Sequence, residues 1–163
     1  MSPSKPSHDT PALVVKLKVE CAAWQALLNV LGEEERALVE GEADRLGKLN
    51  ASKLEQLQTL LNLAHARHDE LLASGHTPDL AGMDAWLSQH GQSEQHILWQ
   101  QLREMEHQAQ AMNQRIGALI DLRLSSTRQA LNVLIHAATS QGGLYDESGL
   151  SVASRNGKPL IAA

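Results

Sequence analysis

The sequence has no phenylalanine, and aromatic residues make up only 2% of its 163 residues. Because aromatic side chains are enriched in β-strands, their shortage argues against a core built from sheets. Leucine and alanine supply much of the 42% hydrophobic content instead, and both residues form helices readily. The composition therefore predicts an all-α protein.

Other absences bear on where the protein acts and what it binds. Cys21 is the only cysteine, so no disulfide can form within the chain, which fits a reducing compartment. The N-terminus lacks a hydrophobic signal region, and no run of about 18 apolar residues could span a membrane. The net charge of −5 and the lack of a basic tract argue against nucleic acid as a partner. We expect a cytoplasmic protein with no nucleic-acid partner and no membrane insertion.

Motifs for catalysis and metal binding are also lacking, including a P-loop, a dinucleotide-binding fingerprint and a nucleophile elbow. Of the eight histidines, His65 and His68 lie three residues apart beside Asp69. Glu104 and His107 form one Glu-x-x-His pair, whereas di-iron bundles need two such pairs and two further glutamates. None of these histidines precedes the Lys-Gly that is usual at phosphotransfer sites. We therefore expect no enzyme activity, no metal and no cofactor.

What the chain does have is one long amphipathic segment, from Ser93 to Thr139, without a proline. Its apolar residues recur at spacings of four and three, with one run of fours, which is typical of a coiled-coil-like helix with one stutter. They are Leu98, Leu102, Met105, Ala109, Met112, Ile116, Ile120, Leu124, Leu131, Leu134 and Ala138. Such a helix extends roughly 65–70 Å, too far for a compact globule of this size. It must lie against other long helices or offer part of its apolar side to a partner.

Two further long helices are predicted before this segment. The first begins near Pro11, and its apolar stripe is Leu13, Leu17, Cys21, Trp24, Leu28, Leu31 and Leu38. The second runs from about Ala43 to Ala73, and its apolar side is predicted to be Leu46, Leu49, Leu54, Leu57, Leu61, Ala64 and Leu71. The short link between them predicts an antiparallel αα-hairpin. A short helix after Thr77-Pro78 is expected to cover one end of the bundle with Trp86.

These patterns divide the chain into three segments. Residues 1–10, rich in serine and proline, are predicted to be a flexible lead-in. Residues 11–139 are predicted to form a bundle or coiled-coil-like domain of long antiparallel helices, made up of the αα-hairpin and the long C-terminal helix. Residues 140–163 contain several glycines and are predicted to be a flexible C-terminal tail.

The functional question is what covers the apolar side of the long helix near its C-terminal end. The residues concerned are Ile120, Leu124, Leu131, Leu134 and Ile135. The other helices are shorter, and the tail has few apolar residues with which to cover this side. Either the helix folds back and buries these residues, or they bind the amphipathic helix of a partner.

Three stretches of the chain carry a resemblance to a known family. They are Gly32–Leu49 (GEEERALVEGEADRLGKL), Ala111–Leu134 (AMNQRIGALIDLRLSSTRQALNVL), and the tail pair Leu144–Gly149 and Asn156–Leu160. Over nearly its full length the chain resembles the FlgN family of flagellar export chaperones. In the second stretch Asn113, Gly117, Leu119 and Ile120 match the family pattern, and Ile116 stands where a second Asn is common. In the tail, Asp146 stands where Gly often follows the Tyr.

This resemblance implies a cytoplasmic, all-helical chaperone without a cofactor or a reaction. Its clients are the hook-associated proteins of the hook–filament junction, FlgK and FlgL, which it keeps unpolymerised and delivers to the export gate protein FlhA. The family uses its C-terminal helix for the client, which implicates Asn113, Ile116, Gly117, Ile120, Leu124, Leu131, Leu134 and Ile135. A tail tyrosine, here Tyr145, is implied to dock at the gate.

A second hypothesis is a structural coiled-coil adaptor or self-associating helical bundle, which would use the same apolar side to form a homodimer. A monomer that binds a client stoichiometrically favours the chaperone. A tight dimer that is indifferent to clients favours the adaptor.

Overall fold

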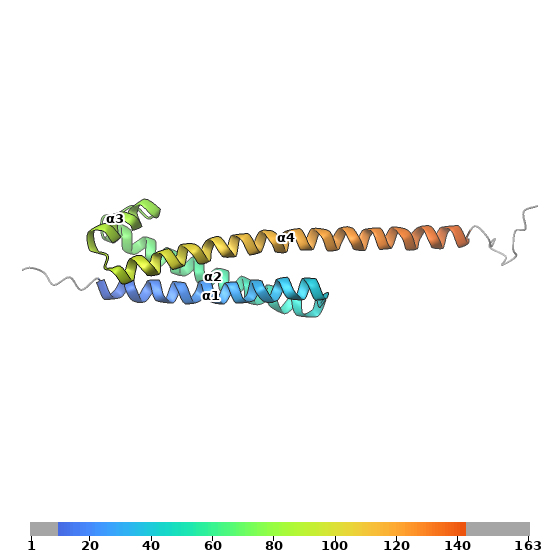
Figure 1. Cartoon of the computed structure of the whole chain (residues 1–163), viewed down its shortest axis with the longest axis horizontal. Coiled ribbons are helices and arrows are strands. Elements are labelled where there is room, and N and C mark those ends of the chain that lie inside the picture. Colours follow the sequence, from blue (N-terminus) through green and yellow to red (C-terminus); the bar gives the residue numbers. More distant parts are fainter. Residues whose placement is uncertain (1–9, 143–163) are drawn as a thin grey trace, which may run out of the picture. The chain divides into compact units, whose positions relative to one another are not determined.

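The computed structural model describes residues 10–142, which form four α-helices and no strand (Figure 1). In chain order the helices are α1 (Thr10–Glu40), α2 (Ala43–Ala73), α3 (Leu80–His90) and α4 (Ser93–Gly142). The all-α prediction is confirmed, and α4 begins at the predicted Ser93 but continues to Gly142. A membrane crossing would need a longer apolar stretch than any helix among these residues provides. The chain divides into two compact units, one ending at Ile120 and the other beginning at Asp121.

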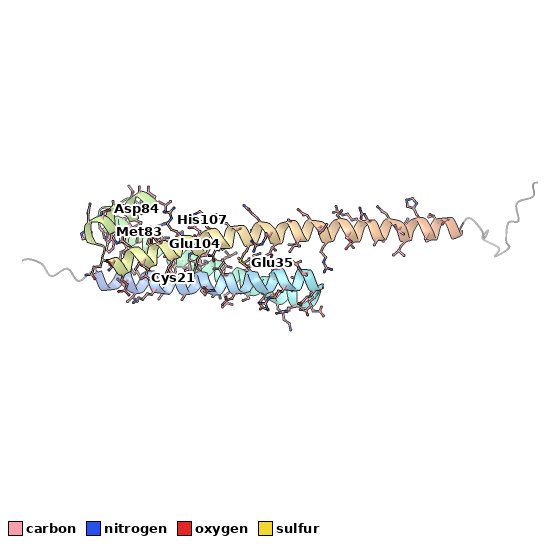
Figure 2. All side chains as sticks on the ribbon, in the orientation of Figure 1. Cys21, Glu35, Met83, Asp84, Glu104 and His107 are labelled. Carbon is pink, nitrogen blue, oxygen red and sulfur yellow. The ribbon has the colours of Figure 1, made fainter. Side chains whose placement is uncertain are left out.

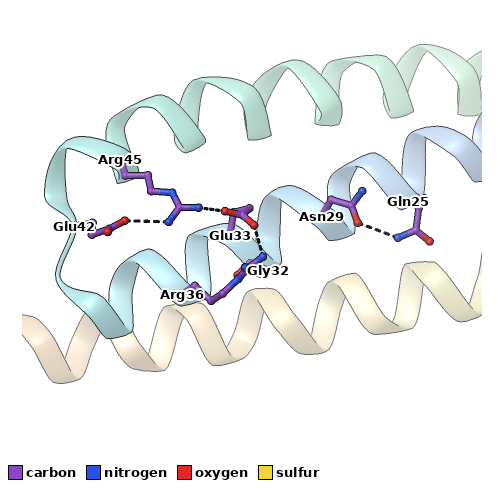
Figure 3. A network of polar contacts seen from close by, with 7 residues as sticks. All are labelled: Gln25, Asn29, Gly32, Glu33, Arg36, Glu42 and Arg45. Atoms are coloured by element: carbon purple, nitrogen blue, oxygen red, sulfur yellow. Dashed lines mark hydrogen bonds and ion pairs between the residues drawn. The ribbon is translucent and has the colours of Figure 1, made fainter.

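The connection between α1 and α2 is a tight turn around Gly41. The φ angle of Gly41 is 78°, a left-handed conformation that glycine adopts without a steric penalty. The backbone N–H groups of Gly41 and Glu42 both donate to the carbonyl oxygen of Ala37, each over 2.9 Å. Arg45 forms ion pairs with Glu42, at 3.0 Å, and with Glu33 on α1 (Figure 3). The turn and these charges together hold α2 against α1 as the predicted hairpin.

Two ion pairs that are largely shielded from solvent fix the register of this hairpin. Arg67 donates two hydrogen bonds to the Glu20 carboxylate, from Nε over 2.9 Å and from Nη2 over 3.1 Å. In the same way, the Lys53 ammonium donates to Glu34 over 2.9 Å. The two acids are two heptads apart on α1, and the two bases are two heptads apart on α2. This matched spacing favours the antiparallel register in which both charges are neutralised.

The packed side of α2 differs from the predicted one. The sequence pattern places Leu54, Leu57 and Leu61 on that side, and this prediction is wrong, because their exposed fractions are 59%, 43% and 50%. The buried or half-buried positions include Leu46, Leu49, Lys53, Leu60, Leu63, Arg67 and Leu71. Lys53 and Arg67 can occupy this side because acids on α1 neutralise them. Leu54, Leu57 and Leu61 form a second, exposed stripe on α2.

Two clusters of buried side chains make up the core of the first unit. The first cluster contains Leu13, Leu17, Leu71, Met83, Trp86, Leu87, Trp99 and Leu102. The second contains Ala23, Leu27, Leu28, Leu31, Leu38, Leu60, Ala109 and Ile116. The stripe predicted for α1 is confirmed, with Cys21 and Trp24 packed against these clusters as half-buried members. All four helices therefore contribute side chains to the packed interior of this unit.

α3 closes the bundle, as predicted, with Trp86, which is only 5% exposed. Met83 and Asp84 lie on this short helix (Figure 2). The indole N–H of Trp99 on α4 donates to the Asp84 carboxylate over 3.3 Å. Apolar packing and this hydrogen bond together attach α3 to α4. The capping residue of α3 is Asp79.

Asp79 accepts the backbone N–H of Gly82 over 2.8 Å and the hydroxyl of Thr77 over 2.7 Å. Two hydrogen bonds lower the pKa of Asp79 below its ordinary value. The one from the Thr77 side chain has the larger effect, and the one from the Gly82 backbone has the next largest. Because the folded-state pKa is lowered, the stabilisation is fully present above the unfolded pKa of about 3.9 and is lost as pH falls through the folded-state pKa. We expect Asp79→Ala to lower the thermal midpoint by a few degrees at neutral pH.

Thermal melts followed by circular dichroism across the acid range check this prediction. The difference between Asp79→Ala and the unchanged protein should shrink towards zero in strong acid, where the cap is protonated in both states. Asp79→Asn is the matched control, because asparagine keeps a capping oxygen that does not titrate. A difference that stays constant down to strong acid would show that the ionised cap does not stabilise α3.

Candidate helix-binding surfaces

The part of α4 that belongs to the second unit is exposed along its described length. Every side chain from Asp121 to Ser140 is exposed. The large hydrophobic ones, with exposed fractions between 49% and 67%, are Leu122, Leu124, Leu131, Val133, Leu134 and Ile135. Exposed hydrophobic side chains in such number along one helix are typical of interaction surfaces.

These side chains fall on two sides of the helix at 3.6 residues per turn. One side, the C-terminal stripe, carries Leu124, Arg128, Leu131, Leu134 and Ile135. Leu122 and Val133 lie on the opposite side and are equally exposed, at 67% each. Arg128 interrupts the C-terminal stripe with one cation between two leucines. The helix therefore presents one apolar stripe that Arg128 interrupts, and two hydrophobic residues on the opposite side.

The remaining predicted client-binding residues belong to the first unit, and the structure separates them. Ile116 is 1% exposed and lies in the second core cluster, so its side chain is not offered to a partner. Asn113 and Gly117 are exposed, and Ile120 is 39% exposed. A Cβ atom on Gly117 would meet nothing within 4 Å. Tyr145 lies outside the described residues.

A notch of about 220 Å³ in the first unit is a feature that the sequence did not reveal. It lies where α1, α2 and α4 meet, and its lining is Trp24, Leu27, Leu31, Lys53, Leu57, Glu106, Ala109, Gln110 and Asn113. Asn113 is the predicted client-binding residue that lines it. Leu57 reaches the notch because it lies off the packed side of α2. The signal in the sequence was the surplus of leucines on α2, more than one packed side can use.

The two charged residues of the notch, Lys53 and Glu106, differ in whether an opposite charge is paired with them. Lys53 is engaged by Glu34, with Nζ 2.9 Å and 3.3 Å from the two carboxylate oxygens. Glu106 is half-buried, and no residue in the described part of the chain forms an ion pair or hydrogen bond with it. The buried indole N–H of Trp24 also lacks an acceptor there. A half-buried carboxylate beside apolar side chains is costly unless a cation approaches it.

The residues considered for catalysis or metal binding do not assemble into a site. Glu104 and His107 lie on α4, and both are exposed (Figure 2). Within residues 10–142, no three His, Cys, Asp or Glu side chains gather closely enough to hold a metal ion. Burial, helped by the charge of Glu20, raises the pKa of the Cys21 thiol. A thiol that stays protonated is a poor nucleophile, so Cys21 acts as a packing residue.

The described residues are all helical, and an exposed apolar stripe such as the one on residues 121–140 is compatible with helix-in-groove binding. The profile of the FlgN protein family matches residues 9–152, which is most of the chain. The chain therefore belongs to the FlgN family. This is a family of flagellar export chaperones, not of enzymes, and its members bind flagellar export substrates. No curated protein and no solved structure matched the chain.

Proposed function

We propose that this protein is a cytoplasmic chaperone that binds the hook-associated proteins FlgK and FlgL before export and delivers them to the export gate protein FlhA. Family membership supports the general role. The observation that carries the proposal is the exposed C-terminal stripe of α4, whose leucines and isoleucine are each about half exposed or more. Such a stripe supplies the hydrophobic contact that a chaperone needs to bind an unassembled client.

The physical task is to cover an amphipathic helix of the client that would otherwise aggregate or polymerise early. A client helix laid along the C-terminal stripe buries apolar surface on both partners by helix-in-groove packing. Each leucine buried in this way contributes about 1.5–3 kcal/mol. Leucine-rich surfaces can repack around different partners, which suits a chaperone with two clients. Binding that rests on a few such side chains remains reversible, as release at the gate requires.

The proposed client contacts keep most of the predicted residues and leave out Ile116, because its side chain belongs to the core. On the second unit they are Leu124, Leu131, Leu134 and Ile135. On the first unit they are Asn113, Gly117 and Ile120. Calorimetric titration of purified FlgK or FlgL with the full chain tests the proposal. Saturable, stoichiometric binding is expected, and no binding to either client would contradict it.

Docking at the gate is assigned to Tyr145, the last aromatic residue in the sequence. An aromatic ring supplies a large contact area for the loss of two torsions. We expect Tyr145→Ala to weaken the association of the chaperone–client complex with the cytoplasmic domain of FlhA about tenfold or more. Client binding should not change, because the tail and the C-terminal stripe are different segments.

Titration of the complex against this FlhA domain measures the effect, with Tyr145→Phe as the control that keeps the ring. Equal gate affinities for the unchanged chain and Tyr145→Ala would remove Tyr145 from the mechanism. A simultaneous loss of client binding would instead place Tyr145 among the client contacts.

A further inference from the structure

The notch between α1, α2 and α4 has a size and a lining that suit side chains of another helix. Its lining is apolar on α1, where Trp24 and Leu31 contribute, and Leu57 of α2 adds to this apolar part. Its volume of about 220 Å³ suits one or two large side chains rather than a whole ligand. The exposed stripe of Leu54, Leu57 and Leu61 continues the apolar surface along α2. A helix lying along this surface would complete a four-helix bundle with α1, α2 and α4.

The charge in the notch defines what that helix must carry. Glu106 is half-buried, and no ion pair within residues 10–142 engages it. Arg103, the nearest cation along α4, lies within one turn of Glu106 and forms no ion pair with it either. Lys53 lines the notch but is already bonded to Glu34. The occupant should therefore offer an apolar stripe with a single Arg or Lys in its middle.

The chain itself contains a segment of this description. In the C-terminal stripe, Arg128 lies between Leu124 and Leu131, one turn from each. All three side chains are exposed, and no hydrogen bond or ion pair of Arg128 is found within the described part of the chain. Residues 121–142 contain two arginines against one aspartate, while residues 10–120 are acidic overall. The stripe and the notch are therefore both apolar, and each carries a charge opposite in sign to that of the other.

We propose that two copies of this chain associate reciprocally when no client is bound, each placing its C-terminal stripe in the notch of the other. Arg128 of one copy pairs with Glu106 of the second, while Leu124 and Leu131 cover Leu57 and Trp24. A two-fold symmetric dimer makes this contact twice, which is the usual form of a homodimer interface. The association hides the same leucines that would otherwise be exposed. If clients bind the C-terminal stripe, they compete with the second copy, but the self-association stands without that assignment.

Sedimentation velocity of the purified full chain, without a client, tests this proposal by charge exchange. A dimer is expected to form as the concentration rises from about 1 to about 100 µM. Glu106→Arg and Arg128→Glu should each raise the dissociation constant at least about tenfold, because like charges then meet at both contacts. An equimolar mixture of the two variants should dimerise like the unchanged chain, since each supplies the charge that the other lost. Glu104→Arg, on the opposite side of α4, is the control and should leave the dissociation constant unchanged.

Three results would overturn the proposal. The first is a monomer at all these concentrations, and the second is a dimer that neither variant weakens. The third is a mixture that stays monomeric, which would show that the two charges do not meet between copies. Circular dichroism establishes that each variant is folded. If Glu106→Arg does not fold, Glu106→Gln replaces it, and its dissociation constant should rise several-fold and lose most of its dependence on salt.

Discussion

Replacing Arg67 by alanine is expected to lower the free energy of unfolding by about 3–5 kcal/mol. The Glu20 side chain is only 4% exposed and receives both of its hydrogen bonds from Arg67. Without the guanidinium, a carboxylate remains in a site that solvent hardly reaches. The guanidinium also lies over the Trp99 ring, with its central carbon 5.0 Å from the ring centroid, so a second contact is lost. Urea unfolding of the full chain measures the effect as a lower midpoint.

Two controls separate the buried charge from ordinary loss of contacts. The double variant Glu20→Leu/Arg67→Met removes both charges, and it should be as stable as the unchanged chain or more stable. Lys18→Ala breaks an ion pair with Glu94 whose side chains are 55% and 59% exposed, and it should cost less than about 1 kcal/mol. An Arg67→Ala protein with an unchanged urea midpoint would show that water solvates Glu20 in the folded state.

Hydrophobic periodicity predicted those helices whose packed side consists of hydrophobic residues. On α1, apolar residues recur every three or four positions, and the residues selected in this way are buried or half-buried. The same holds for the first half of α4, where Leu102, Ala109 and Ile116 are buried. At these positions burial is driven by the hydrophobic effect, so a count of apolar residues finds the right side.

On α2, hydrophobic periodicity did not identify the packed side of the helix. Two of its packed positions are Lys53 and Arg67, and three of its leucines are exposed on another side. The packed side becomes visible only when Glu34 and Glu20 on α1 are considered together with these bases. Those partners lie 19 and 47 residues away in the chain. A pattern confined to one helix cannot contain such a pairing, although the equal spacing of acids and bases leaves a trace of it.

The candidate binding residues illustrate a related limit. The family resemblance indicated the stretch around Asn113 and Ile116 but could not say which side of the helix each residue takes. Ile116 turned out to be a core residue, whereas Asn113, three positions earlier, lines the notch. The notch depends on the space left between three helices. Glu106 lacks a partner because no cationic side chain of the described residues pairs with it in the folded chain. Neither property belongs to any single segment of the sequence.

Changing Leu131 and Leu134 together to aspartate is expected to weaken the binding of FlgK and FlgL at least about 100-fold. Both leucines belong to the C-terminal stripe, with exposed fractions of 55% and 66%, so the change should not disturb the core of the bundle. In the complex, each aspartate would lie against the apolar side of the client helix without a cation to pair with. Calorimetric titration of each client into the variant measures the loss.

The matched control places the same charges on the opposite side of the same helix, as Leu122→Asp and Val133→Asp. These two side chains are each 67% exposed, and aspartate lowers helix propensity there to a similar degree. The control should bind both clients with nearly unchanged affinity, because neither Leu122 nor Val133 is among the proposed client contacts. Far-UV circular dichroism must show equal helical content for the two double variants.

If both variants lose binding equally, the cause is a weakened helix. If a folded Leu131→Asp/Leu134→Asp chain binds as tightly as the unchanged one, the clients bind another surface, because a client helix packed on this stripe could not accommodate two unpaired carboxylates.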